Sequence, residues 1–229
     1  MAWYLEIPLV ILLTLFFIFI IQTFIGRVYV IPSASMEPTL HGLDGKGDRI
    51  AVQKISYYFD DPQPGDVVVF KGTDSWNTQW QSTRSTNPVV AGLQQVGSWA
   101  GIVPPDENNL VKRVIATGGQ TVSCQEGDPA VMVDGKPIDQ SYILTPNFYP
   151  VNPTTGSDAC GGDYFGPIVV PEGTYYMMGD NRTNSLDSRY HMGDEYQGAI
   201  PEENIRGKVA AIVFPLDRFG GIDAPQIQN

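Results

Sequence analysis

The chain contains a serine, Ser35, that could act as a nucleophile if a base accepted its proton. A serine hydroxyl is a weak nucleophile until that happens. Histidine is the usual base, and the chain has two, His41 and His191. A triad of Ser35, His191 and Asp187 is one interpretation, because triads are recognised by geometry rather than by order in the chain. The Gly-x-Ser-x-Gly elbow is absent, however, and no serine is followed by a lysine three residues later.

The other available base is a lysine. Lys112 lies within an apolar run, residues 110–115, that predicts a strand. A lysine in such a strand either reaches water at a sheet edge or is buried, and composition alone favours the exposed position. Burial would lower its pKa from ~10.4, because a buried amine disfavours its charged form. A pKa of ~7–8 would make it a competent base near neutral pH.

An apolar run without charges, residues 7–25, precedes Ser35. A helix rising ~1.5 Å per residue over this run comes close to the ~30 Å thickness of a bilayer core. The run therefore predicts a transmembrane helix after a short flank, residues 1–6, and a connector, residues 26–31, that holds Ser35 near the membrane surface. A cleavable signal peptide ending at residues 33–35 is the alternative. It is disfavoured because no Lys or Arg precedes the run, which also exceeds the usual ~7–15 residues.

The charge balance limits the partners of the chain. Acidic residues outnumber basic ones by 25 to 14, for a net charge of −11. This excludes a nucleic-acid partner and electrostatic adhesion to anionic lipid, since both need a positive surface. The orientation across the membrane stays open on the residues alone. Arg27 after the run would place the domain in the cytoplasm by the positive-inside rule, but large domains translocate largely regardless of charge.

Residues 26–229 predict a mainly β domain. The chain has 24 Gly and 18 Pro, which favours short strands and many turns. Residues 131–138 read as a hairpin with an Asp-Gly turn. Residues 119–170 are expected to form a smaller inserted β-region, and residues 73–109 a long loop. The other expected strands are residues 48–54, 67–70, 110–115, 174–178 and 209–214.

The loop at residues 73–109 contains Trp76, Trp80 and Trp99. Tryptophan suits a membrane interface, where its ring is apolar and its N–H stays hydrated. We expect part of this loop to lean into the outer leaflet. Ordinary packing of a surface loop is the alternative.

The two cysteines, Cys124 and Cys160, have no zinc-ligand pattern around them. A disulfide between them is one possibility if the domain is exported, and it would stabilise the fold by ~3–4 kcal/mol through chain entropy. Two buried free thiols are the other, and the sequence does not decide between them.

Four segments, taken in order, carry a resemblance to a known family. Residues 32–39 (PSASMEPT) resemble the nucleophile box of type I signal peptidases, the membrane-bound Ser/Lys leader peptidases. Residues 65–71 (GDVVVFK) are similar to that family's next strand, and residues 110–115 (LVKRVI) to the box with the general base. Residues 179–189 (GDNRTNSLDSR) resemble its last and most distinctive box. These four segments occur in the family's order after a predicted membrane anchor, and together they extend over essentially the whole chain.

This resemblance implies roles for individual residues. Ser35 would be the nucleophile and Lys112 the neutral general base, with Ser185 orienting the lysine amine. The backbone N–H of Ser35 and the hydroxyl of Ser33 would form the oxyanion hole. The family often has glycine where this chain has Ala34, a change that is tolerated unless the backbone there needs a positive φ.

Two charged pairs follow in the last box. The resemblance makes Asp187 and Arg189 a structural pair that supports the loop of Ser185, whereas the residues alone fit two solvated charges almost equally well. Asp180 and Arg182 have the same status. Neither pair is expected to take part in bond breaking.

Two apolar residues flank the predicted catalytic pair. Met36 follows the nucleophile and Val111 precedes the base. We expect them to line small apolar substrate pockets that accept alanine and reject large side chains. Such pockets match the Ala-x-Ala-like end of exported signal peptides.

The resemblance implies a signal-peptidase-like fold and a membrane-anchored serine endopeptidase that works through an acyl-enzyme without metal or cofactor. It would be a single-pass protein of the plasma membrane, with its catalytic domain on the extracytoplasmic side. The expected partners are secretory preproteins, the lipid bilayer and, by contact, the protein-export machinery.

Two rival functions remain. One is a self-cleaving repressor, which also uses a Ser/Lys dyad. That hypothesis requires a DNA-binding module, whereas this chain has an apolar run and a negative net charge. A non-catalytic membrane-anchored β-domain that binds exported proteins or cell-wall components is the other. Under that second hypothesis Ser35 and Lys112 need not be close, and Lys112 should titrate normally.

Overall fold

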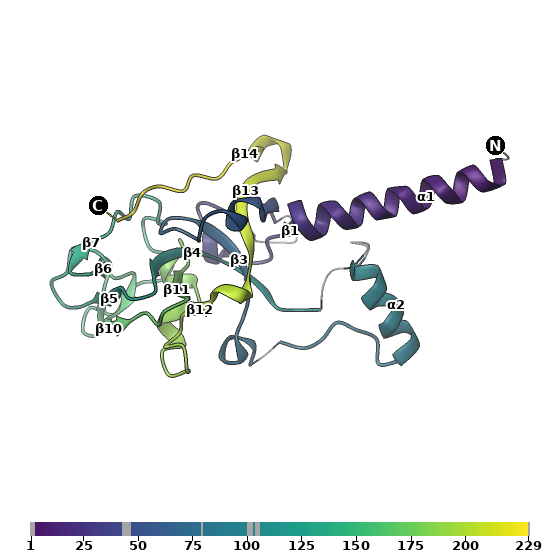
Figure 1. The fold of residues 1–229 in the computed structure, drawn as a ribbon. Helices are drawn as coiled ribbons and strands as arrows, with labels where there is room; N and C mark the ends of the chain where they lie inside the picture. Colours follow the sequence, from purple (N-terminus) through teal and green to yellow (C-terminus); the bar gives the residue numbers. More distant parts are fainter. Residues whose placement is uncertain (1–2, 43–46, 79, 100–102, 104–105, 229) are drawn as a thin grey trace.

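The computed structural model describes residues 3–42, 47–78, 80–99, 103 and 106–228. Its centre is an eight-stranded antiparallel sheet in the order β1-β2-β13-β3-β4-β11-β12, with β14 paired to β13 (Figure 1). The strands are β1 (Gly26–Val30), β2 (Arg49–Gln53), β3 (Val67–Lys71), β4 (Asn109–Thr117), β11 (Thr174–Met178), β12 (Ile200–Pro201), β13 (Ile205–Phe214) and β14 (Gly220–Gly221). The predicted mainly β architecture is confirmed.

Strand β3 forms the buried middle of this sheet, between β13 and β4. Its four apolar residues, Val67 to Phe70, are at most 1% exposed, as expected for a continuous apolar run covered on both faces. The β3–β4 register pairs Val68 with Lys112. The lysine thus enters the structure from a central strand and not from a sheet edge.

A second, smaller set of strands occupies residues 121–169, inside the range where an inserted β-region was expected. Its four-stranded sheet has the order β10-β5-β6-β7, and β8 and β9 pair separately. The expected Asp-Gly turn is present: Asp134 and Gly135 both have positive φ, as a two-residue hairpin requires. The strands are β5 (Thr121–Cys124), β6 (Met132–Val133), β7 (Lys136–Pro137), β8 (Gly156–Ser157), β9 (Gly162–Asp163) and β10 (Phe165–Val169).

The question left open by the two cysteines is resolved by this region. Cys124 and Cys160 form a disulfide and both are fully buried. They belong to a core cluster that also contains Val122, Phe165 and Tyr176, and this cluster packs the second sheet against the main one.

The N-terminal helix α1 (Trp3–Ile20) projects from the end of the domain where β1 lies (Figure 1). Its helical hydrogen bonding widens into a π-turn at Ile21–Ile25, and Gly26 then begins β1. In the part of the chain that the structure describes, no helix combines the length and the apolar character needed to cross a membrane. The predicted transmembrane helix over residues 7–25 is therefore not confirmed.

Residues 26–30, expected as a connector, form strand β1 instead. All five residues pair antiparallel with β2, and Ile31 immediately after them is buried. The signal was present in the alternation of Val28, Tyr29 and Val30, of which only the tyrosine is half-buried. Cleavage at residues 33–35 would remove a strand and a core residue, which argues against the signal-peptide alternative.

Residues 73–109, expected as a loop, contain helix α2 (Pro88–Trp99). Asn87 caps it, because its side-chain oxygen accepts hydrogen bonds from the N–H groups of Val89 and Val90 at 3.0 and 3.5 Å. Proline suits the first helical position after such a cap. The Asn-Pro pair was thus a helix-start signal that the glycines within the segment obscured.

The tryptophans of this segment have different environments. Trp76 is buried in a short 3-10 helix, packs edge-on against Phe70 and stacks on His191, so its predicted membrane position is wrong. Trp80 is exposed. The side chain of Trp99 lies outside the described part of the structure. The 3-10 helices are Ala34–Met36, Ile55–Tyr58, Asp74–Asn77, Arg182–Asn184, Ser188–Tyr190, Glu202–Asn204 and Leu216–Arg218.

Candidate active site

Ser35 lies in the 3-10 helix Ala34–Met36, between β1 and β2. The turn is fixed by its buried neighbours, since Met36 and Leu40 are at most 1% exposed and belong to one core cluster. Backbone hydrogen bonds close the turn from Glu37 N–H to Ala34 C=O and from Leu40 N–H to Met36 C=O. Ser35 itself is only half-buried, so its hydroxyl is held on a rigid support that a substrate can reach.

Lys112 is 4% exposed, and its Nζ donates a hydrogen bond to Ser35 Oγ at 2.7 Å. Burial lowers the pKa of Lys112 to about 8, against the opposing charges of Asp187 and Asp180, with a smaller lowering by Arg189. The amine is therefore neutral at mildly alkaline pH. A neutral amine next to a serine hydroxyl can accept that hydroxyl's proton.

The loop after β11 holds the serine turn from the other side. Asn181 donates its backbone N–H to Ser35 C=O at 3.1 Å and its side-chain Nδ2–H to Ala34 C=O at 3.1 Å. Gly179 allows this approach, because a Cβ there would lie 2.4 Å from Ser35 C=O and 2.3 Å from Ser185 Oγ. Neither residue was singled out from the sequence, since an asparagine and a glycine in a polar loop look like ordinary turn residues.

The other two serines take different positions. Ser33 is exposed, and its Oγ lies 3.3 Å from Ser35 Oγ. Ser185 is buried, but the predicted hydrogen bond to the Lys112 amine is not formed, and Ser185 Oγ has no hydrogen-bond partner. It lies against Gly179 and close enough to Asp187 to help hold the pKa of that carboxyl low. Ala34 does not have a positive φ.

Asp187 and Arg189 form a buried ion pair and not two solvated charges. Arg189 Nε and Nη2 donate to the two carboxylate oxygens of Asp187 at 2.8 and 2.9 Å, and Asp187 also accepts the N–H of Gly179 at 3.0 Å. Burial would raise the pKa of Asp187, but the charge and hydrogen bonds of Arg189 hold it below its usual range. Arg189 also donates to the carbonyls of Gly161 and Arg182 and so ties the loop to the inserted region.

The second predicted pair, Asp180 with Arg182, is wrong, because each of these residues binds another partner. Asp180 is fully buried and binds Arg113, whose Nε and Nη2 donate to it at 2.9 and 2.7 Å. Arg182 instead donates to Gly179 C=O and to the hydroxyl of Tyr142. Arg113 was missed, although a second cation next to Lys112 in an apolar strand needs a buried partner. The alternation of β4 sends neighbouring side chains to opposite faces, so only one of the two cations reaches Ser35.

A small cavity of about 60 Å³ opens beside Ser35 and Lys112. Met36 and Val111 both line it, as expected from their neighbours in the sequence. Other lining residues are Tyr29, Val30, Ile31, Pro32, Ser33, Val69, Asn109 and Leu110. The cavity is therefore mainly apolar and small, with the serine at its edge.

Comparison with known proteins identifies the family of the chain. A family model described as signal peptidase, peptidase S26, matches residues 4–214. The chain belongs to this peptidase family. A probable signal peptidase I of Mycobacterium leprae is 46% identical over 240 residues, which cover 99% of this chain and 81% of the relative. Signal peptidase I of Mycobacterium tuberculosis is 47% identical over 214 residues, with 88% and 69% covered. A probable signal peptidase I-1 of Synechocystis is 34% identical over 216 residues, with 94% and 84% covered.

Membership of the signal peptidase family makes the chain an enzyme, which removes the repressor and the non-catalytic β-domain from consideration. The geometry also argues against a histidine triad in this signal peptidase relative. The carboxylate of Asp187 is occupied by Arg189 and Gly179 N–H, and the ring of His191 stacks on Trp76 with centroids 4.4 Å apart. The two predicted triad partners of Ser35 therefore have other contacts.

Proposed function

We propose that this protein is a membrane-anchored serine endopeptidase that cleaves N-terminal signal peptides from exported preproteins with a Ser35/Lys112 dyad. The observation that carries the proposal is the 2.7 Å contact between Ser35 Oγ and the buried amine of Lys112. Burial gives that amine a pKa of about 8, so it is available as a base near physiological pH.

The dyad carries the reaction through an acyl-enzyme. Neutral Lys112 accepts the hydroxyl proton of Ser35 as Oγ attacks the scissile carbonyl carbon. The resulting ammonium returns the proton to the departing amine when the peptide C–N bond breaks. Lys112 then deprotonates a water, which attacks the Ser35 ester, and the proton returns to Ser35 Oγ when the signal peptide leaves.

Two further serines support this chemistry. The N–H of Ser35 and the hydroxyl of Ser33 stabilise the tetrahedral oxyanion, a contribution of ~3–4 kcal/mol for one donor in other serine proteases. Ser185 is a positioning residue for Lys112. Its hydroxyl is buried beside Gly179, and it would bind the amine once Ser35 Oγ turns toward the substrate. The pair Asp187–Arg189 holds the loop that carries Ser185.

The small cavity explains a preference for small residues. At about 60 Å³, with Met36 and Val111 in its wall, it accommodates an alanine methyl group and excludes large side chains. β1 is an edge strand next to this cavity, so its unpaired backbone groups can bind an extended peptide. Cleavage is therefore expected after small residues, at an Ala-x-Ala-like end.

Attachment to the membrane is assigned to the apolar segment at residues 7–25. Large side chains of α1 such as Leu12 and Phe17 are more than half exposed, which is unfavourable in water and favourable in lipid. The disulfide favours the extracytoplasmic side of a plasma membrane, because the cytosol keeps thiols reduced. This location would also bring the enzyme beside the export machinery that delivers its substrates.

Single substitutions test the dyad. Ser35→Ala, Lys112→Ala and Lys112→Arg should each abolish cleavage of a purified preprotein, measured by gel shift of the mature product. Lys71→Ala, an exposed lysine on β3, is the matched control and should cleave normally. Circular dichroism should show a folded domain in every variant. Cleavage retained after loss of either dyad member would refute the mechanism.

A further inference from the structure

Helix α2 presents its apolar side outward. Val89, Leu93 and Val96 are 70%, 68% and 57% exposed. Their spacing of four and three residues places them on one face of the helix. A helix of a water-soluble domain normally turns this face to the core, so α2 has the reverse orientation.

The polar side of α2 faces its own chain. Gln94 Oε1 accepts the N–H of Ser85 at 2.9 Å, and the buried hydroxyl of Ser98 donates to Gln95 C=O at 3.0 Å. The first bond ties the helix to the preceding segment, and the second satisfies a buried hydroxyl within the helix itself. The outward direction of the valines and the leucine is thus built into the segment.

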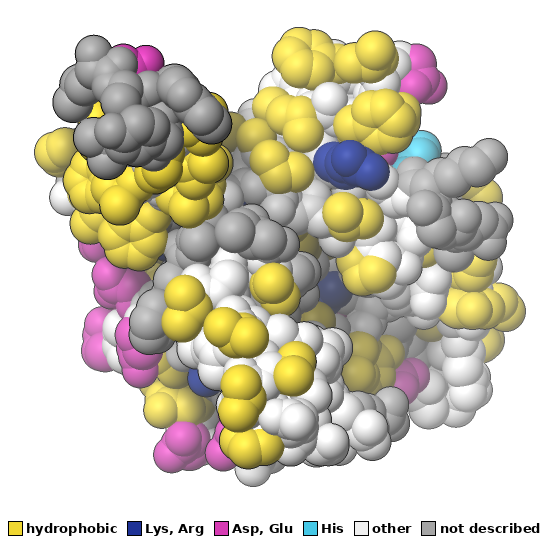
Figure 2. All heavy atoms as spheres, turned by 90° about the vertical axis from the view of Figure 1, so that its right-hand side faces the viewer, with side chains coloured by type: hydrophobic (Ala, Val, Ile, Leu, Met, Phe, Trp, Pro, Cys, Tyr) yellow, Lys and Arg dark blue, Asp and Glu magenta, His cyan; other side chains and the backbone are white. Residues whose placement is uncertain are grey.

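The position of α2 continues the apolar surface of α1. Both helices project from the same end of the domain (Figure 1), and hydrophobic side chains gather on that end in Figure 2. Val103 lies against α2, since its N–H donates to Gly97 C=O at 3.2 Å. Together with Ile18 and Ile21 it lines an apolar groove of about 880 Å³.

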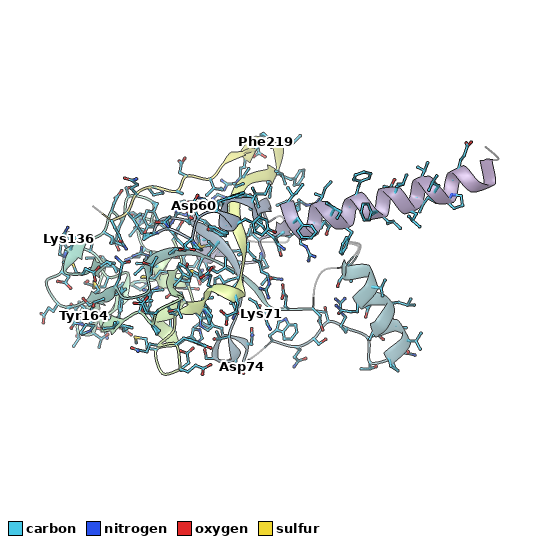
Figure 3. The ribbon with its side chains drawn as sticks, viewed as in Figure 1. Asp60, Lys71, Asp74, Lys136, Tyr164 and Phe219 are labelled. Carbon is cyan, nitrogen blue, oxygen red and sulfur yellow. A yellow bond between two sulfur atoms is a disulfide. The ribbon has the colours of Figure 1, made fainter. Side chains whose placement is uncertain are left out.

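The absence of charged residues around α2 limits the kind of surface to which it can bind. No charged residue occurs between Arg84 and Asp106, so α2 has no cation with which to bind anionic headgroups. Figure 3 shows the side chains of α2 standing away from the β-domain, beyond the point where Lys71 and Asp74 mark the exit of the chain. A neutral helix with one apolar face matches the boundary between headgroups and acyl chains.

We propose that α2 is an interfacial helix that inserts Val89, Leu93 and Val96 into the lipid bilayer, binding through burial of apolar surface and not through lipid charge. The inference rests on the proposed membrane function and deepens it. With α1 as one attachment and α2 as a second, the domain is held at two points. This limits its rotation about α1 and keeps the Ser35 cavity at a fixed height above the membrane.

Fluorescence quenching in the full chain tests the insertion. Leu93→Cys receives a nitrobenzoxadiazole label, and Gln95→Cys, on the opposite face of α2, is the matched control. The natural cysteines are joined in a disulfide, so the label has one target. In phosphatidylcholine vesicles, nitroxide-bearing lipid should quench the Leu93 label severalfold more than the Gln95 label. Added salt or phosphatidylglycerol should not change this, and equal quenching or a requirement for anionic lipid would overturn the proposal.

Cleavage assays distinguish lipid from the other molecules that could cover the apolar face of α2. The double variant Leu93→Ser/Val96→Ser should cleave a soluble peptide normally but cleave a vesicle-embedded preprotein severalfold more slowly. Slower cleavage of both substrates, without lipid quenching, would mean that α2 contacts the signal peptide. A Leu93 label shielded from lipid in a cross-linked dimer would mean that a second copy covers it. If Ser35→Ala still cleaves while quenching persists, the proposed dyad fails and the interfacial helix stands.

Discussion

At the scale of single residues, the proposed chemistry depends on the burial of one amine. Lys112 keeps a low pKa because water is excluded from it, although Asp187 and Asp180 oppose the shift. Both carboxylates are paired with arginines, Asp187 with Arg189 and Asp180 with Arg113, and the charge of Arg189 lowers the pKa of Lys112 further. The two buried ion pairs therefore let a lysine sit near two acids and still lose its proton.

The pH dependence of cleavage follows from this pKa. The base must be neutral, and Lys112 becomes neutral as the pH rises through about 8. We expect kcat/KM for a soluble peptide to rise about tenfold per pH unit below that value and to level off above it. A stopped assay between pH 6 and 10 measures the profile. A profile that falls through this range would contradict a neutral lysine base.

Asn181 should be a positioning residue for the nucleophile. Asn181→Ala removes the side-chain hydrogen bond to Ala34 C=O while leaving the backbone bond to Ser35 in place. A misplaced nucleophile lowers the rate of the chemical step, so kcat should fall by about 10- to 100-fold with little change in KM. Steady-state kinetics on a soluble peptide check this, with Asn184→Ala in the same loop as control. An increase in KM without a change in kcat would instead assign Asn181 to substrate binding.

At the scale of elements, the inserted region supports the loop that surrounds the dyad. Gly161, next to the disulfide residue Cys160, accepts a hydrogen bond from Arg189, and Arg189 holds Asp187. The disulfide thus fixes a segment that contacts the last loop of the site. The second sheet contributes to the site although none of its strands supplies a predicted catalytic residue.

Breaking the disulfide should therefore destabilise more than the inserted region. The double variant Cys124→Ala/Cys160→Ala should lower the free energy of unfolding by ~2–4 kcal/mol, since the unfolded chain regains its loop entropy. Urea unfolding in detergent, followed by tryptophan fluorescence, measures the loss. Dithiothreitol treatment of the unmodified protein should give a similar shift and should leave the variant unchanged. Equal stability of oxidised and reduced protein would show that the crosslink constrains nothing.

At the scale of the whole molecule, the two helices and the edge strand β1 lie at one end of the domain and the second sheet at the other (Figure 1). Ser35 follows β1 in the chain, and Tyr29 and Val30 of that edge strand line the cavity beside it. A substrate held in the membrane would meet the enzyme at this end. The chain as a whole has a net charge of −11, which disfavours binding to an anionic lipid surface.

Removal of residues 1–25 should weaken the attachment of the enzyme to the membrane. β1 begins at Gly26, so the truncated chain keeps the complete main sheet. The full chain should remain in the membrane pellet after an alkaline carbonate wash, and the truncated chain should divide between pellet and supernatant because α2 still binds lipid. Cleavage of a soluble peptide should persist in both. Release of the full chain by carbonate would contradict the assigned anchor.

Much of the secondary structure of this protein could be predicted from local sequence patterns. Alternating and continuous apolar runs predicted β2, β3, β4, β11 and part of β13, and the Asp-Gly pair predicted a hairpin turn, because period and turn chemistry are properties of neighbouring residues. The resemblance of four short segments pointed to Ser35 and Lys112. Local pattern failed at two elements. β1 follows directly on the apolar run of residues 7–25 and was taken as a connector, and the glycines of α2 masked its Asn-Pro start.

Tertiary structure decided what these residues can do. Ser35 and Lys112 are 77 positions apart, and only the register of β4 beside β3 together with the Asn181 clamp brings their side chains to 2.7 Å. The partner of Asp180, the unpaired state of Ser185 and the outward face of α2 were equally invisible in the one-dimensional chain. Burial is a property of the packed whole, and it is burial that lowers the pKa of Lys112 and qualifies it for the proposed role of base.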